Sequence, residues 1–345
     1  MAPGSQTKTM ELQDQDGPVA RLTSDPDPQS TANLSPRFQK LVKEFYHLNW
    51  FERACGFTAP LVWRNIFIFT VLHILALIGV CYGPYASWYT WWSFFPMYLM
   101  SGLGVTAGAH RYWAHKTYKA RMPLQIILML CNCISTQNDI LVWSRDHRVH
   151  HKFTETNADP HNARRGFFFA HIGWLLMKKH PDVFIKGEAV DVSDLKKDPV
   201  IQFQIRYYLP LCLLCNIILP TFVPYLVWGE DLTTAYFVLF AFRYVMTLHS
   251  TWLVNSAAHL WGSQPYDKHM NPSDNRFVAI AAIGEGWHNY HHTFPYDYAT
   301  SEWGPKLNMT TICIDVFAFL GLAYDRKQVS QESIDRVRRR IGDLS

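Results

Sequence analysis

The segment from Asn65 to Ala109 reads NIFIFTVLHILALIGVCYGPYASWYTWWSFFPMYLMSGLGVTAGA and contains no Lys, Arg, Asp or Glu. A Gly-Pro pair at 83–84 divides it into two apolar segments, residues 64–82 and 88–107. Each is close to the roughly 20 residues that an α-helix needs to cross a bilayer. The segment therefore predicts two transmembrane helices that are joined as a hairpin.

A second uncharged run covers residues 207–228, and a further apolar run follows after a short turn, over 232–257. Arg243 interrupts the latter run, and an ionisable residue at such depth usually faces a cavity or a partner. We expect helices over 208–228 and 232–257, and hence an all-α integral membrane protein with four transmembrane helices in two hairpins. The shorter apolar stretch 124–133 predicts a helix that lies under the membrane or closes a site.

The distribution of Lys and Arg predicts the orientation of these helices. The two hairpin joints carry neither residue, whereas residues 110–206 carry many. The positive-inside rule therefore places this segment and both chain termini in the cytosol. We expect a cytosolic helical cap built from residues 110–206 and 258–330, within a membrane domain that covers residues 39–330.

Both ends of the chain differ in composition from the membrane domain. Residues 1–38 are rich in Asp, Gln, Ser, Thr and Pro and predict a disordered polar tail. Residues 39–55 predict a short helix, either at the membrane surface or packed on the protein. Residues 331–345 form a basic C-terminal tail, in which the arginines of 336–340 either dock an acidic electron donor or anionic lipid or lie on a solvated helix end.

Composition and charge exclude several classes of function. Hydrophobic residues make up 49% of the chain and aromatic residues 15%, and this aromatic share is high for a soluble protein. The formal net charge of +4 is too small to indicate nucleic-acid binding. The seven cysteines form neither a disulfide framework nor a zinc-binding pattern.

Eight histidines fall into three short clusters, and a ninth, His259, lies close in sequence to the last membrane segment. The clusters are His110 and His115; His147, His150 and His151; and His288, His291 and His292. Imidazole is a common ligand for transition metals at neutral pH. Nine imidazoles exceed the coordination positions of one metal, so the pattern predicts two metals that share one cytosolic site.

Helix geometry predicts how the clusters divide. His147 and His151 lie on one line of a helix with His150 to the side, and the third cluster repeats this arrangement. Each helix can therefore contact two neighbouring metals. His110 and His115 diverge by about 140° on an ideal α-helix, so we expect them on different metals, or a helix that ends between them.

The donor set also bears on the metal. Catalytic zinc sites use about three protein ligands, and soluble di-iron sites rely on Glu and Glu-x-x-His motifs. A histidine-rich pair of irons with oxygen chemistry fits the clusters best. Glu285 and Asp146 are candidates for orienting imidazoles. The remaining histidines are expected in packing, surface or supporting roles, and these are His47, His73, His161, His171, His180, His249 and His269.

Longer stretches around the clusters resemble a known family. They are Asn255-Ser-Ala-Ala-His-Leu-Trp, Asp159-Pro-His-Asn, Arg165-Gly-Phe-Phe-Phe and Gly284-Glu-Gly-Trp-His-Asn-Tyr-His-His-Thr-Phe-Pro-Tyr-Asp-Tyr. Together with the three histidine clusters, they resemble the membrane fatty acyl-CoA desaturases of the stearoyl-CoA desaturase type. The resemblance covers roughly residues 45–330.

The resemblance implies an enzyme of fatty acid and lipid biosynthesis in the endoplasmic reticulum membrane. Such an enzyme removes two hydrogens from a saturated fatty acyl-CoA, usually to give a cis delta-9 double bond. It uses molecular oxygen and electrons from NADH, delivered by a reductase and cytochrome b5. The resemblance also implies a cap that holds two iron ions (Fe2+), with Asn255 acting through a water and the other ligands being His110, His115, His147, His150, His151, His259, His288, His291 and His292.

The resemblance further assigns substrate contacts. The CoA group and the upper acyl chain are expected at Asn65, Asn138, Arg145, Asp146, Lys178, Lys179 and Trp252. Lys178 departs from relatives that often have Arg there, and Lys lacks the bidentate fork of Arg. The chain is expected to bend at Gln137, Trp143 and Thr251. Tyr98 and Gly102 are expected at the closed end of the tunnel, where Gly102 either leaves room for the terminal methyl or permits close helix packing.

Two alternatives remain open at this stage. One keeps the di-iron site but gives an acyl hydroxylase or a desaturase of another double-bond position. The other is a membrane metal transporter or sensor that does not act as an enzyme. Histidines on one side of the membrane and almost no charged residues within the spans argue against a permeation path.

Overall fold

The computed structural model describes residues 34–343 and divides into two compact units, up to Pro60 and from Leu61 onward. The first unit contains α2 (Pro36–Tyr46) and α3 (Trp50–Ala54). The single helix expected over 39–55 is therefore two helices. Asn49 starts the second, because its side chain accepts a bond from the Glu52 N–H at 2.9 Å while the Glu52 carboxylate accepts from the Asn49 N–H at 2.8 Å, a capping box.

The start of α2 shortens the polar tail predicted for residues 1–38, since Pro36 is already helical. Proline is favoured in the first turn of a helix, where its missing N–H has no partner to lose. The rest of that prediction, residues 1–33, lies outside the described residues.

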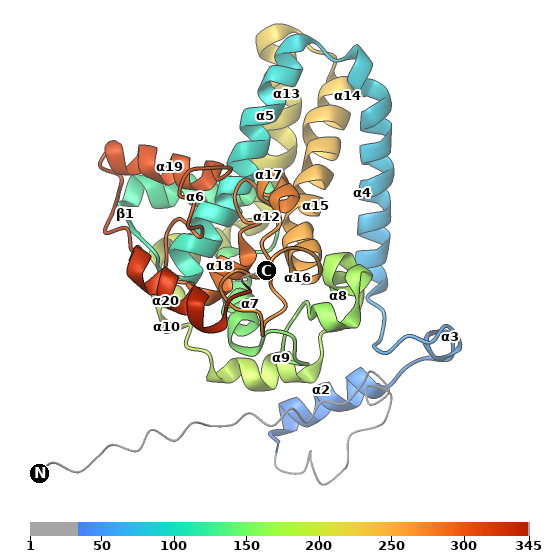
Figure 1. Ribbon diagram of the computed structural model, residues 1–345. Helices are drawn as coiled ribbons and strands as arrows, with labels where there is room; N and C mark the ends of the chain where they lie inside the picture. Colours follow the sequence, from blue (N-terminus) through green and yellow to red (C-terminus); the bar gives the residue numbers. More distant parts are fainter. Residues whose placement is uncertain (1–33, 344–345) are drawn as a thin grey trace, which may run out of the picture. The chain divides into compact units, whose positions relative to one another are not determined.

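The membrane segments of the second unit follow the predicted hairpins (Figure 1). The first hairpin consists of α4 (Trp63–Tyr82), η2 (Gly83–Tyr85), α5 (Trp88–Leu103) and the π-helix η3 (Gly104–Ala114). The second consists of α12 (Tyr208–Cys212), η7 (Leu213–Ile218), α13 (Leu219–Trp228), α14 (Leu232–Ala235), η8 (Tyr236–Phe242), α15 (Arg243–Asn255) and α16 (Ala257–Leu260).

Within residues 34–343, three helical segments are long and apolar enough to cross a membrane, namely Trp63–Tyr85, Tyr208–Trp228 and Leu232–Leu260. A bent pair, Met122–Ser135 with Ile140–Phe153 at 84°, would make a fourth if it were one span. The predicted second span is shorter as a regular helix, because α5 has 16 residues before the hydrogen-bond pattern changes at Gly104. The backbone nevertheless continues as a helix to Ala114.

Large apolar side chains on these helices face outward. Phe67 of α4 is 71% exposed, Trp92 of α5 75% and Leu226 of α13 75%. Exposed apolar surface of this extent marks a membrane or an interface. Arg243 faces inward as predicted: it is fully buried, and its guanidinium donates to Asn216 and to the Leu239 carbonyl.

One carboxylate ties the two hairpin joints together. Glu230, which follows α13, accepts bonds from the Ser87 N–H at 2.9 Å, the Ser87 hydroxyl at 2.8 Å and the Thr90 hydroxyl. Gly229 before it has φ of +70°, a left-handed conformation that glycine adopts at little cost. The joints are therefore fixed relative to each other at the end of the bundle far from the histidines.

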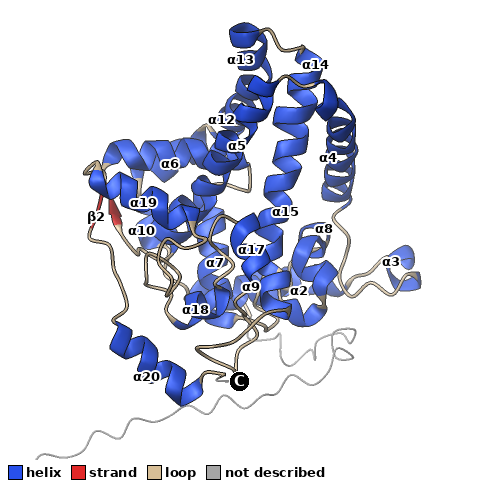
Figure 2. Cartoon of the chain, turned by 45° about the horizontal axis from the view of Figure 1, so that its top comes forward, coloured by secondary structure: helices blue, strands red, loops and turns tan. Residues whose placement is uncertain are grey.

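The remaining elements are short helices around α7 and α18 (Figures 1 and 2). They are α6 (Met122–Ser135), α7 (Ile140–Phe153), η4 (Ala163–Arg165), η5 (Phe169–Gly173), α8 (Trp174–Leu176), α9 (Pro181–Ile185), η6 (Lys186–Ala189), α10 (Ser193–Lys197), α11 (Pro199–Arg206), α17 (Arg276–Ala281), α18 (His288–Thr293), α19 (Met309–Phe319) and α20 (Gln331–Ile341). One antiparallel pair, β1 (Lys119–Ala120) with β2 (Ala323–Tyr324), adds a short sheet to the all-α fold that we predicted.

The basic C-terminal segment is a helix that contacts its own unit. Arg338 of α20 pairs with Glu302 and lies 5.1 Å from the Tyr266 ring centre, while Ile334 is buried. The hypothesis that the arginines of 336–340 dock a partner therefore does not extend to Arg338, whose guanidinium is already paired. Residues 344–345 of the predicted tail lie outside the described residues.

Candidate active site

The nine histidines predicted as ligands meet in the structure as two groups of donor atoms. Within each group, one ligand atom from every member lies within 4.8 Å of the others. The first group is His110, His115, His147, His151 and His291, and the second is His150, His259, His288 and His292. Four segments distant in sequence, residues 110–115, 147–151, 259 and 288–292, thus supply two neighbouring groups that could each hold a metal ion.

Helices α7 and α18 divide their histidines as the helix geometry predicts. His147 and His151 belong to the first group, while His150, one position to the side, belongs to the second. On α18 the assignment is reversed, because His288 and His292 join the second group and His291 the first. Each helix therefore lies between the two groups and contacts both.

The expectation that His110 and His115 serve different metals is wrong. Both belong to the first group, with ring centres 5.0 Å apart. The backbone from Gly104 to Ala114 is a π-helix, and the His115 N–H bonds the His110 carbonyl at 3.0 Å. A π-helix repeats at i+5, so residues five apart share a face that a regular α-helix would separate. The other alternative, a helix that ends between the two residues, is confirmed, because the helix ends at Ala114, one residue before His115.

Three carboxylates orient imidazoles from outside the groups. Glu285 accepts from His110 Nδ1 at 2.8 Å, Asp159 from His150 Nδ1 at 2.9 Å and Glu155 from His259 Nδ1 at 3.0 Å. Since a carboxylate only accepts, each Nδ1 carries the proton and each Nε2 presents a lone pair. These lone pairs point at other ring nitrogens, with His110 Nε2 2.9 Å from His291 Nε2 and His259 Nε2 3.0 Å from His288 Nε2.

Of the two carboxylates that the sequence suggested for this role, Glu285 fills it and Asp146 does not. Asp146 instead pairs with Arg145 at 2.7 Å and with Lys179. Asp159 and Glu155 lie in the loop after α7 and were not predicted as partners of histidines. The Asp159-Pro-His-Asn stretch resembles the desaturase family in sequence, but its spacing does not indicate which histidine Asp159 would contact.

Burial keeps the imidazoles neutral. The pKa values of His115, His288, His291 and His292 lie well below the usual 6.5, first because of burial and then because neighbouring histidines repel a second positive charge. Burial alone would raise the pKa of Glu285, but Arg111 and His110 lower it to about 2. A divalent transition metal requires neutral imidazoles as ligands, and the lowered pKa values of these four histidines meet that requirement.

Two neighbouring cavities border the histidines. The inner cavity is lined by Tyr98, Gly102, Ser250 and Ile283 at one end and by His110, His147, His150 and His288 at the other. The outer cleft is lined by Asn65, Asn138, Asp146, His161 and Trp252, among others. Trp143, His147, Thr251 and Asn255 line both.

Of the three residues predicted to bend a chain, Trp143 and Thr251 line both cavities and Gln137 lines the outer cleft. Trp143 stacks on His147 with ring centres 5.0 Å apart, and Gln137 donates to the Thr251 hydroxyl at 3.0 Å. Gln137 belongs to the short turn between α6 and α7, in which Thr136 and Asn138 have positive φ. An elongated ligand that filled both cavities would therefore pass these side chains directly beside a metal-site histidine.

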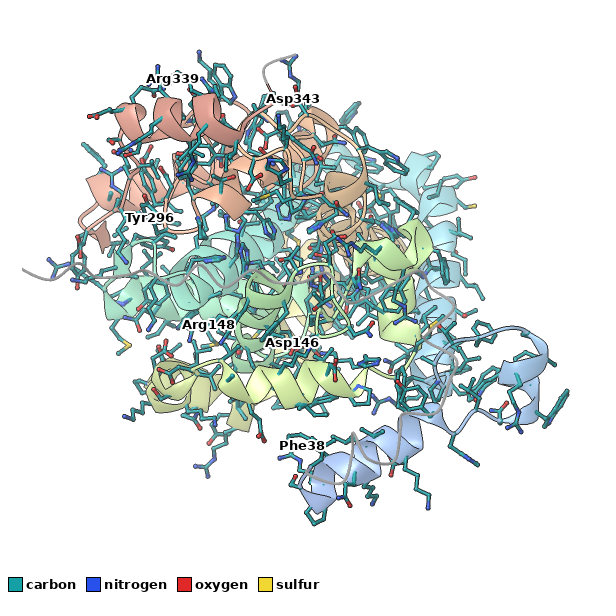
Figure 3. All side chains as sticks on the ribbon, turned by 60° about the horizontal axis from the view of Figure 1, so that its bottom comes forward. Phe38, Asp146, Arg148, Tyr296, Arg339 and Asp343 are labelled. Atoms are coloured by element: carbon teal, nitrogen blue, oxygen red, sulfur yellow. The ribbon has the colours of Figure 1, made fainter. Side chains whose placement is uncertain are left out.

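The outer cleft has a charged rim. Asp146 of α7 pairs with Lys179. Arg148, which lies on the same helix (Figure 3), pairs with Asp194 at 2.8 Å. Lys178 and Lys179 line a smaller neighbouring pocket. Arg64, which the sequence analysis did not single out, lies in the lining of the cleft beside Asn65.

A second histidine group escaped the sequence analysis. His73 Nε2 lies 3.1 Å from His249 Nε2, His249 Nδ1 lies 2.9 Å from His171 Nε2, and His171 Nδ1 lies 2.9 Å from the Ser256 hydroxyl. The three rings surround Trp252, with centres 5.2 to 6.4 Å from its own. They come from three separate segments, so no local spacing could reveal them. Their contacts indicate that they support Trp252 at the cleft.

A buried carboxyl group predicts a pH dependence of stability. Burial raises the pKa of Asp274 to about 7, although bonds from the Asn289 and Tyr290 N–H groups at 2.9 and 3.2 Å act in the opposite direction. The unfolded value is about 3.9, so the contribution of this group to stability is complete below about pH 4 and is lost as pH rises through 7. We expect the apparent Tm in detergent to fall between pH 5.5 and 8, and to fall less in Asp274→Asn. Equal slopes for the two proteins would contradict this assignment.

Comparison with known proteins identifies the family. A model described as "Fatty acid desaturase" matches residues 86–301. The chain belongs to the fatty acid desaturase family. It is 58% identical to an acyl-CoA desaturase of Cyprinus carpio over 286 residues, which are 83% of this chain and 88% of that protein.

Other members of the family are similar over nearly the same length. A stearoyl-CoA desaturase of Homo sapiens is 53% identical over 283 residues, 82% of this chain and 79% of that protein. An acyl-CoA Delta-9 desaturase of Acheta domesticus is 54% identical over 288 residues, 83% of this chain and 80% of that protein.

Proposed function

We propose that this desaturase family member introduces a cis delta-9 double bond into saturated fatty acyl-CoA. The observation that carries the proposal is the wall that the two cavities share, which contains Trp143, Thr251 and His147. An acyl chain that runs from the charged outer cleft into the inner cavity would expose one C–C bond to the histidines. Fixed positioning of that kind selects which hydrogens are removed.

The reaction balances with oxygen as the terminal oxidant. One O2, two electrons, two protons and the two hydrogens of the acyl chain give two waters and the double bond. The electrons are proposed to come from NADH through a reductase and cytochrome b5. Two iron ions, when bound, supply the oxygen-dependent abstraction of hydrogen, which the side chains of this site have no means to perform.

The histidine groups fit such ions. Five imidazoles in the first group and four in the second, with Asn255 acting on the second metal through a water, would hold one iron each. The lone pairs of His110, His150 and His259 point at ring nitrogens of His291, His292 and His288, and a cation between the rings could be bound by the lone pairs of both. The carboxylates behind them keep each ring in the required orientation.

The membrane arrangement is proposed to have four spans, with α5 and the first residues of η3, up to about residue 107, as the second. The bent pair of α6 and α7 is a poor span, because α7 carries Arg145, Asp146 and Arg148 together. Both termini and the histidine site then lie on the cytosolic side of the endoplasmic reticulum membrane. CoA, a soluble polyanion, can reach Lys178, Lys179, Arg145 and Asn65 from that side.

The charged rim of the outer cleft predicts a binding defect. Replacing Lys179 by Ala removes one cation that would bind the CoA phosphates. It also removes one of the partners of Asp146. Because a charge-assisted bond contributes about 1.5–3 kcal/mol, we expect KM for acyl-CoA to rise roughly tenfold with kcat within about twofold. Lys306→Ala, an exposed lysine elsewhere on the same unit, serves as the control. An unchanged KM in the Lys179 variant would remove Lys179 from the substrate contacts.

Expression in a desaturase-deficient yeast tests the function directly. We expect growth without added unsaturated fatty acid, and double bonds at carbon 9 when lipid products are located by mass spectrometry. Hydroxylated acyl chains would favour the hydroxylase alternative. Metal accumulation without any new lipid product would favour the transporter or sensor.

A further inference from the structure

The closed end of the inner cavity contains a side chain that the sequence did not point to. Ile283, in the turn after α17, lines this cavity together with Tyr98 and Gly102. A Cβ added to Gly102 would lie 2.6 Å from Ile283 Cδ1 and 3.3 Å from Cγ1. The room that Gly102 leaves is therefore filled by Ile283, which corrects the expectation that the terminal methyl of a substrate occupies it.

The backbone of Ile283 is in an unusual conformation. Its φ is +48°, a left-handed value that β-branched residues rarely adopt and that costs of the order of 1–3 kcal/mol. The Ile283 carbonyl accepts bonds from the Thr310 N–H at 3.0 Å and the Thr310 hydroxyl at 2.9 Å. Thr310 is in turn 2.8 Å from the Thr106 hydroxyl. These hydrogen bonds fix the turn. Ile283 therefore occupies a position of positive φ at which glycine would relieve the backbone strain.

Tyr98, the other wall of this end, is held differently. Its hydroxyl donates to the Ala281 carbonyl at 2.6 Å and is bonded to the Ser250 hydroxyl. Moving Tyr98 would break two partly buried hydrogen bonds, whereas the Ile283 side chain makes only apolar contacts. Of the two walls, Ile283 is the one whose size can change without the loss of a polar interaction.

We infer that Ile283 sets the length of acyl chain that this enzyme accepts, and that Gly102 serves to accommodate the Ile283 side chain. The inference rests on the proposed function, in which the inner cavity holds the methyl end of the substrate. Ile283 is a specificity-determining residue and takes no part in hydrogen removal. The double bond should stay at the same distance from the thioester, because that distance is measured from the CoA end.

Product profiles on saturated acyl-CoAs of 14 to 22 carbons test the inference. Truncation in Ile283→Ala makes room for about two methylenes, and each methylene buried is worth about a factor of four in binding. Two substrates are compared, the acyl-CoA that the wild type prefers and the one that is two carbons longer. The kcat/KM of the longer substrate divided by that of the preferred one should rise roughly tenfold in Ile283→Ala. Ile283→Gly, which also relieves the positive φ, should shift the preference in the same direction and guards against loss of folding. Ile280→Ala, at an exposed position three residues earlier, should leave the profile unchanged.

Gly102 provides the second half of the test. Gly102→Ala should shift preference toward shorter chains, because the new methyl pushes Ile283 into the cavity, and Gly102→Leu should do so more strongly. The double variant Gly102→Ala with Ile283→Ala should return toward the wild-type profile. Equal loss of activity at every length without such rescue would show that Gly102 serves helix packing and would overturn the inference.

The outcome for the wild-type protein separates this inference from the function on which it rests. No unsaturated product from any acyl-CoA would refute the proposed function itself. Wild-type desaturation combined with an unchanged length profile in both Ile283 variants would refute only the role of Ile283.

Discussion

Replacing His291 or His150 by Ala is expected to abolish desaturation while the protein still inserts into the membrane. His291 Nε2 lies 2.9 Å from both His110 Nε2 and His151 Nε2 in the first group. His150 belongs to the second group, so the two substitutions affect different groups of candidate ligands. Since even residues that only orient a ligand contribute 10–100-fold, loss of a ligand should lower activity at least about 100-fold.

Metal analysis distinguishes this result from misfolding. Each variant should bind about one iron per chain in place of two, and its elution in detergent should match that of the wild type. His269→Ala is the matched control, because His269 is exposed and belongs to neither group. A His291 or His150 variant with normal turnover and normal iron content would show that the residue is not a ligand.

Short-range periodicity accounts for the part of the site that sequence predicts well. On α7 and α18, residues four apart lie on one line and the third is displaced to the side. Both helices are regular where they carry histidines, so the division of their ligands between two groups follows from spacing alone. The apolar runs give the hairpins for the same reason, because helix length and hydropathy are local properties.

The position of His115 depended on a feature that spacing does not encode. The chain changes to a π-helix at Gly104, where a Cβ would lie 2.2 Å from the backbone of Cys131 and Asn132 on α6. Close packing of two helices thus accompanies the change of pitch. An argument that assumes 3.6 residues per turn separates His110 from His115, and only the tertiary contact reveals otherwise.

Contacts between distant segments explain the other omissions. Glu155 reaches His259 across 104 positions of sequence, and His73 reaches His249 across 176. Ile283 is a further case, since its positive φ belongs to a turn that Thr310 holds from another helix. In each case the residue type was visible in the sequence, but its partner was determined by the fold.

Glu285→Gln is expected to destabilise the protein strongly, because Glu285 neutralises a cation with no access to solvent. Its Oε1 accepts from Arg111 Nη2 at 2.7 Å and Nε at 3.1 Å, and Arg111 is 0% exposed. Breaking a buried pair by removing one partner costs about 3–5 kcal/mol, since the other charge is left uncompensated. The apparent Tm of the metal-free protein should therefore fall by several degrees, measured by intrinsic tryptophan fluorescence in detergent.

The test of this prediction uses an exposed ion pair as its comparison. Asp315 pairs with Arg326, and both side chains are 37% exposed, so Asp315→Asn should cost less than about 1 kcal/mol. Adding Arg111→Met to Glu285→Gln should recover part of the lost Tm, because the uncompensated charge is removed. His110 would still lack its carboxylate acceptor in the double variant, so iron binding should remain weak even where stability returns. A Glu285→Gln protein that unfolds at the wild-type temperature would show that Arg111 does not depend on this carboxylate for its charge balance.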